Sequence, residues 1–339
     1  MIDCSKNVQA FHDEKVRLSK ASQDQLRDHR RANRDRIAAG LERDSGPVVK
    51  RHVPQGSYSM HTINQEPDGA YDIDDGVAFK ASDLVGSRGV ALSSLDARNL
   101  VLDAVWDKSF ATPPELKKNC VRVHYAGGHH VDIPVYRETL NEYGNVYLEL
   151  ASSSWKLSDP EAVTNWFNNA VIDKSPDKTN GRQMRRVVRL LKSFTKSRSS
   201  WNMPSGFVLS VLVDDYYKPV TGRDDEAFVE TIRGIESRLA ITKLVRHPVL
   251  DEYLVDDESD ARMKTLSEKL SWVLGELDVL SGIGCTKLKA LEAWKVAFNT
   301  DFFDERISDE KAKTQVLASA LVAKTRVQPS PWCPTDAMV

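Results

Sequence analysis

The chain has 339 residues with a formal net charge of −2, and 41% of its residues are hydrophobic. A chain of this length can bury one large core or two ordinary ones, and its balanced charge gives no overall basic signature for duplex nucleic acid. Its cysteines, Cys4, Cys120, Cys285 and Cys333, have no Cys-x-x-Cys spacing, which argues against a disulfide framework and against a zinc site.

Residues 5–44 place apolar side chains among dense charges and predict a helix. Its arginines alternate with Asp24, Asp28 and Asp35, which favours a solvated helix face over a nucleic-acid contact. Glycine and proline in residues 44–54 predict a connection to the next unit.

A candidate anion-binding loop follows Pro54 and consists of Gln55, Gly56 and Ser57. A Gly-Ser turn that opens a short helix directs free backbone N–H groups and a hydroxyl at an anion. The simplest such anion is a triphosphate.

Two carboxylates come next, because Asp72 and Asp74 alternate about Ile73. In a strand these side chains share a face, with Cα atoms roughly 6.5 Å apart, and such a pair can clamp divalent cations. The alternative is a solvated acidic turn that ends at Gly76. Asp75 points away from the pair, and we expect it to shape a turn and bind no metal.

Residues 93–107 predict a helix capped by Ser93 or Ser94. Its buried stripe is predicted to hold Leu95, Leu100, Val101, Ala104 and Val105. Strands are expected at residues 120–125, 129–137 and 145–151, with a hairpin turn at Ala126-Gly127-Gly128.

The second of these strands offers a third acid. Val131 and Ile133 form its core face, so Asp132 and His130 point the other way. Three aspartates behind a Gly-Ser loop suit a two-metal nucleotidyl-transfer site. A transition-metal site with both His129 and His130 is the alternative, but neighbouring strand residues point to opposite faces.

Past Ser158 the sequence predicts helix after helix. Ser158-Asp159-Pro160-Glu161 has the form of a capping box. Further periodic stretches cover residues 180–197, 205–216, 225–245, 259–280, 285–299 and 308–324. The proline-containing segment from Arg326 to Val339 predicts a flexible tail.

Three motifs in this order carry a family resemblance: Gln-Gly-Ser at 55–57, Asp-Ile-Asp-Asp-Gly at 72–76 and Val-Asp-Ile-Pro-Val-Tyr at 131–136. They resemble the loop and acidic motifs of polymerase-beta-like nucleotidyltransferases, and more narrowly the bacterial cyclic GMP-AMP synthases of the DncV kind. The similarity runs from about Arg51 to Phe303. It implies an α+β fold with an N-terminal helix and nucleotidyltransferase core at 1–157, an α-helical domain at 158–325 that closes the cleft, and a tail at 326–339.

The resemblance also implies roles for residues. Asp72, Asp74 and Asp132 would hold two Mg²⁺ or Mn²⁺ ions, with Asp132 at the ion nearer the acceptor hydroxyl. Further residues would bind the donor nucleotide: Gln55, Gly56, Ser57, Lys192, Arg182 and Ser205. Taken alone, the helix face with Arg185, Arg189, Lys192 and Lys196 favours a solvated basic surface, and Ser205 favours a helix cap.

The implied activity joins ATP, GTP or other nucleoside triphosphates into a cyclic di- or trinucleotide and releases pyrophosphate. Such products act in anti-phage signalling through a downstream effector, and some synthases are handled at the C-terminus, here Val339, by ubiquitin-like conjugation partners. Duplex DNA is not expected as a partner, since we find no Cys- and His-containing insertion. No apolar run reaches the ~20 residues of a transmembrane helix and the polar N-terminus differs from a signal sequence, so a cytoplasmic protein without a membrane partner is expected.

Other functions stay open at this point. A linear oligoadenylate synthetase or an RNA-terminal nucleotidyltransferase would use the same loop and acids. A nucleotide-binding scaffold without turnover is a third possibility, although clustered carboxylates without metal repel one another and destabilise a fold. The sequence does not predict the bases of the product.

Overall fold

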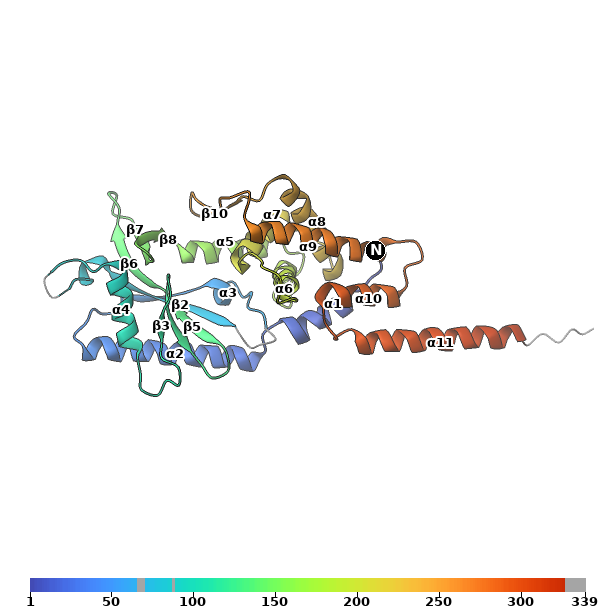
Figure 1. Ribbon diagram of the computed structural model, residues 1–339, viewed down its shortest axis with the longest axis horizontal. Coiled ribbons are helices and arrows are strands. Elements are labelled where there is room, and N and C mark those ends of the chain that lie inside the picture. Colours follow the sequence, from blue (N-terminus) through green and yellow to red (C-terminus); the bar gives the residue numbers. More distant parts are fainter. Residues whose placement is uncertain (66–70, 87–88, 327–339) are drawn as a thin grey trace, which may run out of the picture.

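The structure is a computed structural model that describes residues 1–65, 71–86 and 89–326. Figure 1 shows a sheet with helices α2 and α4 at one end of the molecule and a group of helices at the other, with α11 leading away from the body. The predicted tail from Arg326 to Val339 lies outside the described residues except for Arg326, which ends α11.

The N-terminal helix is interrupted, contrary to the prediction of one helix over 5–44. It consists of α1 (Ser5–Phe11), a π-helical turn η1 (His12–Val16) and α2 (Lys20–Arg43). The side chain of Ser19 caps α2 by accepting the backbone N–H of Ser22. The interruption lets α1 join the helical group while α2 lies against the sheet.

The sheet is centred on β2 (Asp72–Lys80). Strands β5 (His130–Ile133) and β6 (Val135–Leu140) pair parallel with β2 in one continuous register, Asp74 opposite Asp132 and Val77 opposite Val135. Pro134 separates them because it has no N–H to donate, while its carbonyl accepts the Val77 N–H at 2.9 Å. The strand predicted over 129–137 is therefore two strands in line.

The remaining strands extend this mixed sheet on both sides. β1 (Arg51–Gln55) pairs antiparallel with β2, so the predicted connection over 44–54 ends in a strand. β4 (Val121–His124) forms the predicted hairpin with β5, and β3 (Glu115–Leu116) pairs with β4. β7 (Val146–Ala151) and β8 (Trp155–Ser158) follow β6.

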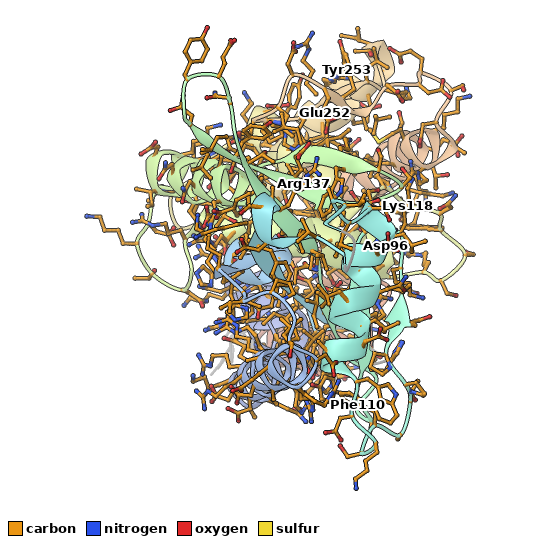
Figure 2. All side chains as sticks on the ribbon, turned by 90° about the vertical axis from the view of Figure 1, so that its left-hand side faces the viewer. Asp96, Phe110, Lys118, Arg137, Glu252 and Tyr253 are labelled. Atoms are coloured by element: carbon orange, nitrogen blue, oxygen red, sulfur yellow. The ribbon has the colours of Figure 1, made fainter. Side chains whose placement is uncertain are left out.

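Helices α2 and α4 (Ser94–Val105) cover one face of the sheet, where Ile73, Val77 and Val131 are buried. Figure 2 looks onto this end of the molecule, with Asp96 in the first turn of α4. Ser93 caps α4, as predicted, but Leu95 is 49% exposed because Ala97 and Arg98 take the buried positions.

The helical group follows β8 as predicted. A short turn η2 (Ala81–Asp83) lies earlier in the chain, and a small hairpin, β9 (Val245–Arg246) with β10 (Tyr253–Val255), lies between α8 and α9. The helices are α5 (Pro160–Lys174), α6 (Gln183–Lys196), α7 (Gly206–Tyr216), α8 (Asp224–Ile241), α9 (Ala261–Leu277), η3 (Asp278–Ser281), α10 (Lys287–Phe298) and α11 (Asp304–Arg326).

Two details of the predicted caps and charges differ. Asp159 alone caps α5, accepting the Ala162 N–H at 2.9 Å, since Ser158 ends β8 and leaves no capping box. On α2, Arg34 is not a solvated charge, because it holds both carboxylate oxygens of the buried Asp75. Asp75 points away from Asp72 and Asp74 as predicted, but it lies within β2 and not in a turn.

The described residues form two main cores. One lies between the sheet and the helices α2 and α4, and the other fills the helical group around Trp294, Phe194 and Phe228. Val8 and Phe11 of α1 belong to the second core. Packing thus places α1 with the helices of the C-terminal half, although it precedes the sheet in sequence.

Candidate active site

The Gly-Ser loop lies where β1 ends at Gln55 and α3 (Gly56–Ser59) begins. Gly56 has a φ of +67°, a backbone conformation that L side chains rarely adopt. An added Cβ would also lie 2.0 Å from Oδ2 of Asp74. Only glycine therefore allows the loop to approach the acids of β2 this closely.

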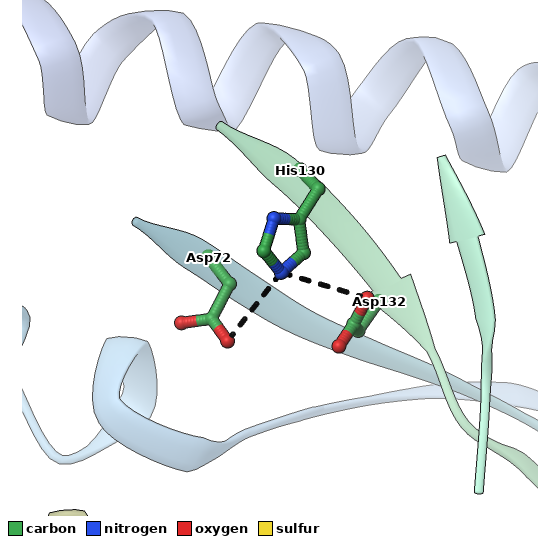
Figure 3. A group of neighbouring side chains, drawn as sticks. All are labelled: Asp72, His130 and Asp132. Carbon is green, nitrogen blue, oxygen red and sulfur yellow. Dashed lines mark ion pairs between the residues drawn. The ribbon is translucent and has the colours of Figure 1, made fainter. Parts of the chain in front are cut away.

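Three aspartates and one histidine lie together on neighbouring strands. We call this group of Asp72, Asp74, Asp132 and His130 the square. In the parallel register of β2 and β5, Asp72 is opposite His130 and Asp74 is opposite Asp132. Residues two apart in a strand share a face, so all four side chains lie on the face opposite the core. Figure 3 shows Asp72, His130 and Asp132 directed toward one another.

The electrostatics of the square disfavour three negative charges without a cation. Burial raises the pKa of Asp74 well above its ordinary value, and the neighbouring charges of Asp72 and Asp132 raise it further. Arg122 of β4 binds Asp132 through two hydrogen bonds of 2.7 Å, from Nε and from Nη2. Asp132 thus has a charge partner from the protein, whereas the pKa of Asp74 remains raised.

His130 is the other sign that this site is built for a cation. Its Nε2 is buried and has no hydrogen-bond partner among the described residues. It lies 3.8 Å from Oδ2 of Asp72 and 3.9 Å from Oδ1 of Asp132, too far for a hydrogen bond. One ligand atom from each of Asp72, His130 and Asp132 lies within 4.8 Å of the others, so these residues fit a divalent metal ion.

The segment after α3 is held by three cations of α6. Arg185 donates from Nε to the carbonyl of Met60 at 3.1 Å, Arg189 donates to that of His61, and Lys192 donates from Nζ to that of Thr62 at 3.1 Å. These three residues occupy successive turns of one helix face, and their acceptors are three consecutive carbonyls. We call this set the α6 clamp.

The α6 clamp holds strained backbone and a buried charge. His61 has a φ of +54°, which costs free energy in a residue with a Cβ. Arg189 is 8% exposed, and burial lowers its pKa to about 10. The prediction of a solvated basic face is therefore wrong for Arg189.

A cavity of about 1040 Å³ lies between the sheet and the helices. Most of the residues predicted for the site line it: Gln55, Gly56, Ser57, Asp72, Asp74, Lys192 and Ser205. Ser205 also caps α7, as predicted, by accepting the Val208 N–H. Asp132 lies beside the cavity in the square.

Arg182 is the predicted residue that lies apart from both the cavity and the group of acids. It precedes α6 with a φ of +70° and donates from Nη1 to the carbonyl of Asp177 at 3.0 Å. It therefore holds the turn before α6, at the N-terminal end of this helix, whereas Lys192 lies near its C-terminal end.

Several residues of the site were not predicted from the sequence. Arg122 lies in a predicted strand, but the sequence does not show that it pairs with Asp132. The contacts of Arg185 and Arg189 likewise become visible only in the folded structure. Trp201, Phe207 and His247 add aromatic surface to the cavity wall, with Phe207 and His247 in edge-to-face contact at 5.4 Å. Such rings are able to stack on or flank a nucleobase.

A loop that faces paired carboxylates on the open side of a mixed sheet, with a helical group across the cavity, defines a polymerase-beta-like nucleotidyltransferase fold. Residues 50–136 match the family model described as cyclic GMP-AMP synthase DncV-like, nucleotidyltransferase domain. The family resemblance predicted from the sequence is confirmed over this part of the chain.

Individual proteins agree with this assignment. A cyclic GMP-AMP synthase of Escherichia albertii is 28% identical over 217 residues, which cover 61% of this chain and 46% of that protein. The chain thus matches about half the length of this curated relative.

None of the helices in the described part of the chain combines the length and the apolar character needed to cross a bilayer.

Solved structures show the same fold. The Vibrio cholerae DncV cyclic AMP-GMP synthase superposes with a TM-score of 0.66 at 19% identity, covering 84% of this chain and 92% of that one. The Bradyrhizobium diazoefficiens CD-NTase CdnG, in complex with GTP, superposes with a TM-score of 0.70 at 15% identity, covering 91% and 100%. The predicted α+β fold with a helical C-terminal part is confirmed.

Proposed function

We propose that this chain is a metal-dependent nucleotidyltransferase that joins nucleoside triphosphates, ATP and GTP among them, into a cyclic di- or trinucleotide and releases pyrophosphate at each bond. The observation that carries the proposal is that Asp72, Asp74, Asp132 and His130 lie directly beside the Gly-Ser loop, at a cavity of about 1040 Å³. Small-molecule pockets usually measure about 300–1,000 Å³, so this cavity is at the upper end of that range and has room for a nucleoside triphosphate.

The proposed roles follow from the positions of the side chains. Ser57 and the backbone N–H groups of the loop bind the donor triphosphate, and Gln55 holds the loop by accepting the Tyr136 hydroxyl at 2.6 Å. Asp132, oriented by Arg122, positions the acceptor hydroxyl and favours its deprotonated form. Lys192 lies at the cavity wall, where it reaches donor phosphates, while Arg182 supports the turn before α6.

Divalent ions, with Mg²⁺ as the usual one and Mn²⁺ as an alternative, would be held by Asp72, Asp74 and Asp132. When bound, they supply the charge neutralisation that nucleotidyl transfer needs at the attacking and leaving oxygens. The chain itself contributes alignment, since the loop and the acids approach each other through Gly56.

The biological setting is proposed from the family resemblance. A cyclic nucleotide made by this chain would act as a second messenger in anti-phage defence in the cytoplasm by switching on a downstream effector. The predicted division into a core at 1–157, a helical domain at 158–325 and a tail at 326–339, with a ubiquitin-like conjugation partner at Val339, belongs to the same proposal, except that α1 packs in the core of the helical group.

The test is incubation of the purified chain with Mg²⁺ and all four nucleoside triphosphates, followed by phosphatase and mass spectrometry. A cyclic product keeps one phosphate per nucleotide after phosphatase, whereas a trimmed linear product has one fewer. Asp72→Asn serves as the inactive control. A linear product would move the chain to oligoadenylate or RNA-terminal synthesis, and no product with any nucleotide pair would support a silent nucleotide-binding scaffold.

A further inference from the structure

The fourth corner of the square is an imidazole in a place where three carboxylates would be enough for an all-oxygen site. His130 lies opposite Asp72 in the register of β2 and β5, and it shares a face with Asp132. The strand geometry therefore fixes its direction toward the acids, as Figure 3 shows.

The contacts of Nε2 point to a ligand that is a cation. This nitrogen is buried and unpartnered among the described residues, and it lies 3.8 Å from a carboxylate oxygen of Asp72 and 3.9 Å from one of Asp132. Ligand atoms about 2.1 Å from one octahedral ion lie about 3.0 Å apart when adjacent and about 4.2 Å apart when opposite. The observed separations fall between these two values.

An ion pair between His130 and the acids does not account for the arrangement. A protonated imidazole would close to hydrogen-bond distance of a carboxylate, near 2.8 Å. Arg122 already holds both oxygens of Asp132 at 2.7 Å, and each oxygen retains a second lone pair for a metal. An arginine that orients a ligating carboxylate is a common outer partner of a metal site.

We propose that His130 is a direct ligand, through Nε2, of the ion that Asp72 and Asp132 hold. The inference rests on the proposed function, since it concerns the same metal site. Imidazole is a good ligand for first-row transition ions and a poor one for Mg²⁺, which prefers oxygen. This position therefore selects a transition-metal dication such as Mn²⁺ over Mg²⁺, whereas the loop-facing position at Asp74 is all oxygen.

The test is electron spin-echo spectroscopy of the full chain loaded with Mn²⁺, which detects the magnetic coupling of a directly bound ¹⁴N. We expect a ¹⁴N coupling in the natural protein, its loss in His130→Ala, and its retention in His129→Ala. His129 is a matched control because it points to the other face, where its Nε2 lies 2.8 Å from Nδ1 of His29. Titration followed by the Mn²⁺ signal should show about tenfold weaker binding in His130→Ala and nearly unchanged binding of Mg²⁺ by competition.

The outcomes separate this inference from the proposed function. Mn²⁺ that binds, is lost in Asp72→Asn and shows no ¹⁴N coupling would overturn the role of His130 and leave the carboxylate site in place. Failure of the natural protein to bind Mn²⁺ at all would overturn the role of His130, and product formation with Mg²⁺ would then decide the proposed function separately. Circular dichroism checks the fold of each variant, and if His130→Ala does not fold, a coupling present in both the natural protein and His129→Ala still supports the inference.

Discussion

The acidic side of the cavity is a piece of regular sheet, whereas the loop side is an irregular segment tied to a distant helix. Asp72, Asp74 and Asp132 are placed by strand alternation and by one parallel register. Residues 60–62 are placed by the α6 clamp, in which Arg189 reaches the His61 carbonyl from 128 residues further along the chain. Gly56 is where the two sides meet.

The two sides also differ in their cost to the fold. Burial, together with the neighbouring charges of Asp72 and Asp132, raises the pKa of Asp74, so the acidic side destabilises the metal-free protein at neutral pH. The α6 clamp stabilises the loop by pairing carbonyls with cations, since hydrogen bonds to charged groups are worth about 1.5–3 kcal/mol. The sheet thus keeps the carboxylates together although their charges repel one another. The loop depends on hydrogen bonds from α6, so a substitution or a movement of α6 would alter its position.

The largest effect is expected from the acidic side. Asp72→Asn or Asp74→Asn should raise the barrier to nucleotidyl transfer by ~4 kcal/mol, roughly a thousandfold in rate, because a ligand charge is lost from the metal site. Product formation across a Mg²⁺ titration measures it. A variant that works near the natural rate at saturating Mg²⁺ would remove that residue from the site.

The next effect is expected where the two sides meet. Gly56→Ala places a Cβ against Oδ2 of Asp74 and forces a positive φ on alanine, so the loop must move away from the acids. Misplacement by about 1 Å can cost about 100-fold in rate. Gly222→Ala is a matched control, because Gly222 has a φ of +72° and no heavy atom within 4 Å of an added Cβ. Equal rates in the two variants would show that strain alone, and not the approach to Asp74, matters.

A smaller effect is expected from the α6 clamp. Arg189→Ala removes the donor to His61 and should lower the free energy of unfolding by about 1–3 kcal/mol and raise the KM for the donor nucleotide about tenfold. Arg98→Ala is the control, because Arg98 is also buried and donates to the carbonyls of Lys117 and Ser152, behind the sheet. It should lose stability with little change in KM. If Arg98→Ala raised the KM as much as Arg189→Ala does, the effect of the α6 clamp on KM would reflect only a general loss of stability.

The sequence was informative about the acidic side because its geometry is local. Alternation about Ile73 and about Val131 sets the faces of the acids, and the Gly-Ser pair marks a turn whatever the rest of the chain does. The α6 clamp was not predictable, since the period of α6 shows which residues share a face but not what that face touches. Arg34 with Asp75 and Arg122 with Asp132 were missed for the same reason.

The smallest effect concerns the thermal stability of the metal-free protein. Removing a charge from the acidic side should raise this stability, whereas removing a cation from the α6 clamp should lower it. Because the pKa of Asp74 is raised in the folded state, the folded protein holds its proton more tightly than the unfolded chain does. The stability from this group is present below the ordinary carboxylate pKa and is lost as the pH rises through the raised value, by about 1.4 kcal/mol for each unit of the shift. Asp74→Asn cannot lose a proton, so in EDTA it should melt at a higher temperature than the natural protein at pH 7, with the difference shrinking toward pH 4.

Asp75→Asn should melt lower at pH 7, because it leaves the Arg34 guanidinium without its buried partner. Saturating Mg²⁺ should reduce the advantage of Asp74→Asn, since an ion that binds only the folded state stabilises the natural protein more. Melting curves of the natural protein and Asp74→Asn that coincide from pH 4 to 8 in EDTA would contradict the idea that the acidic side opposes the fold.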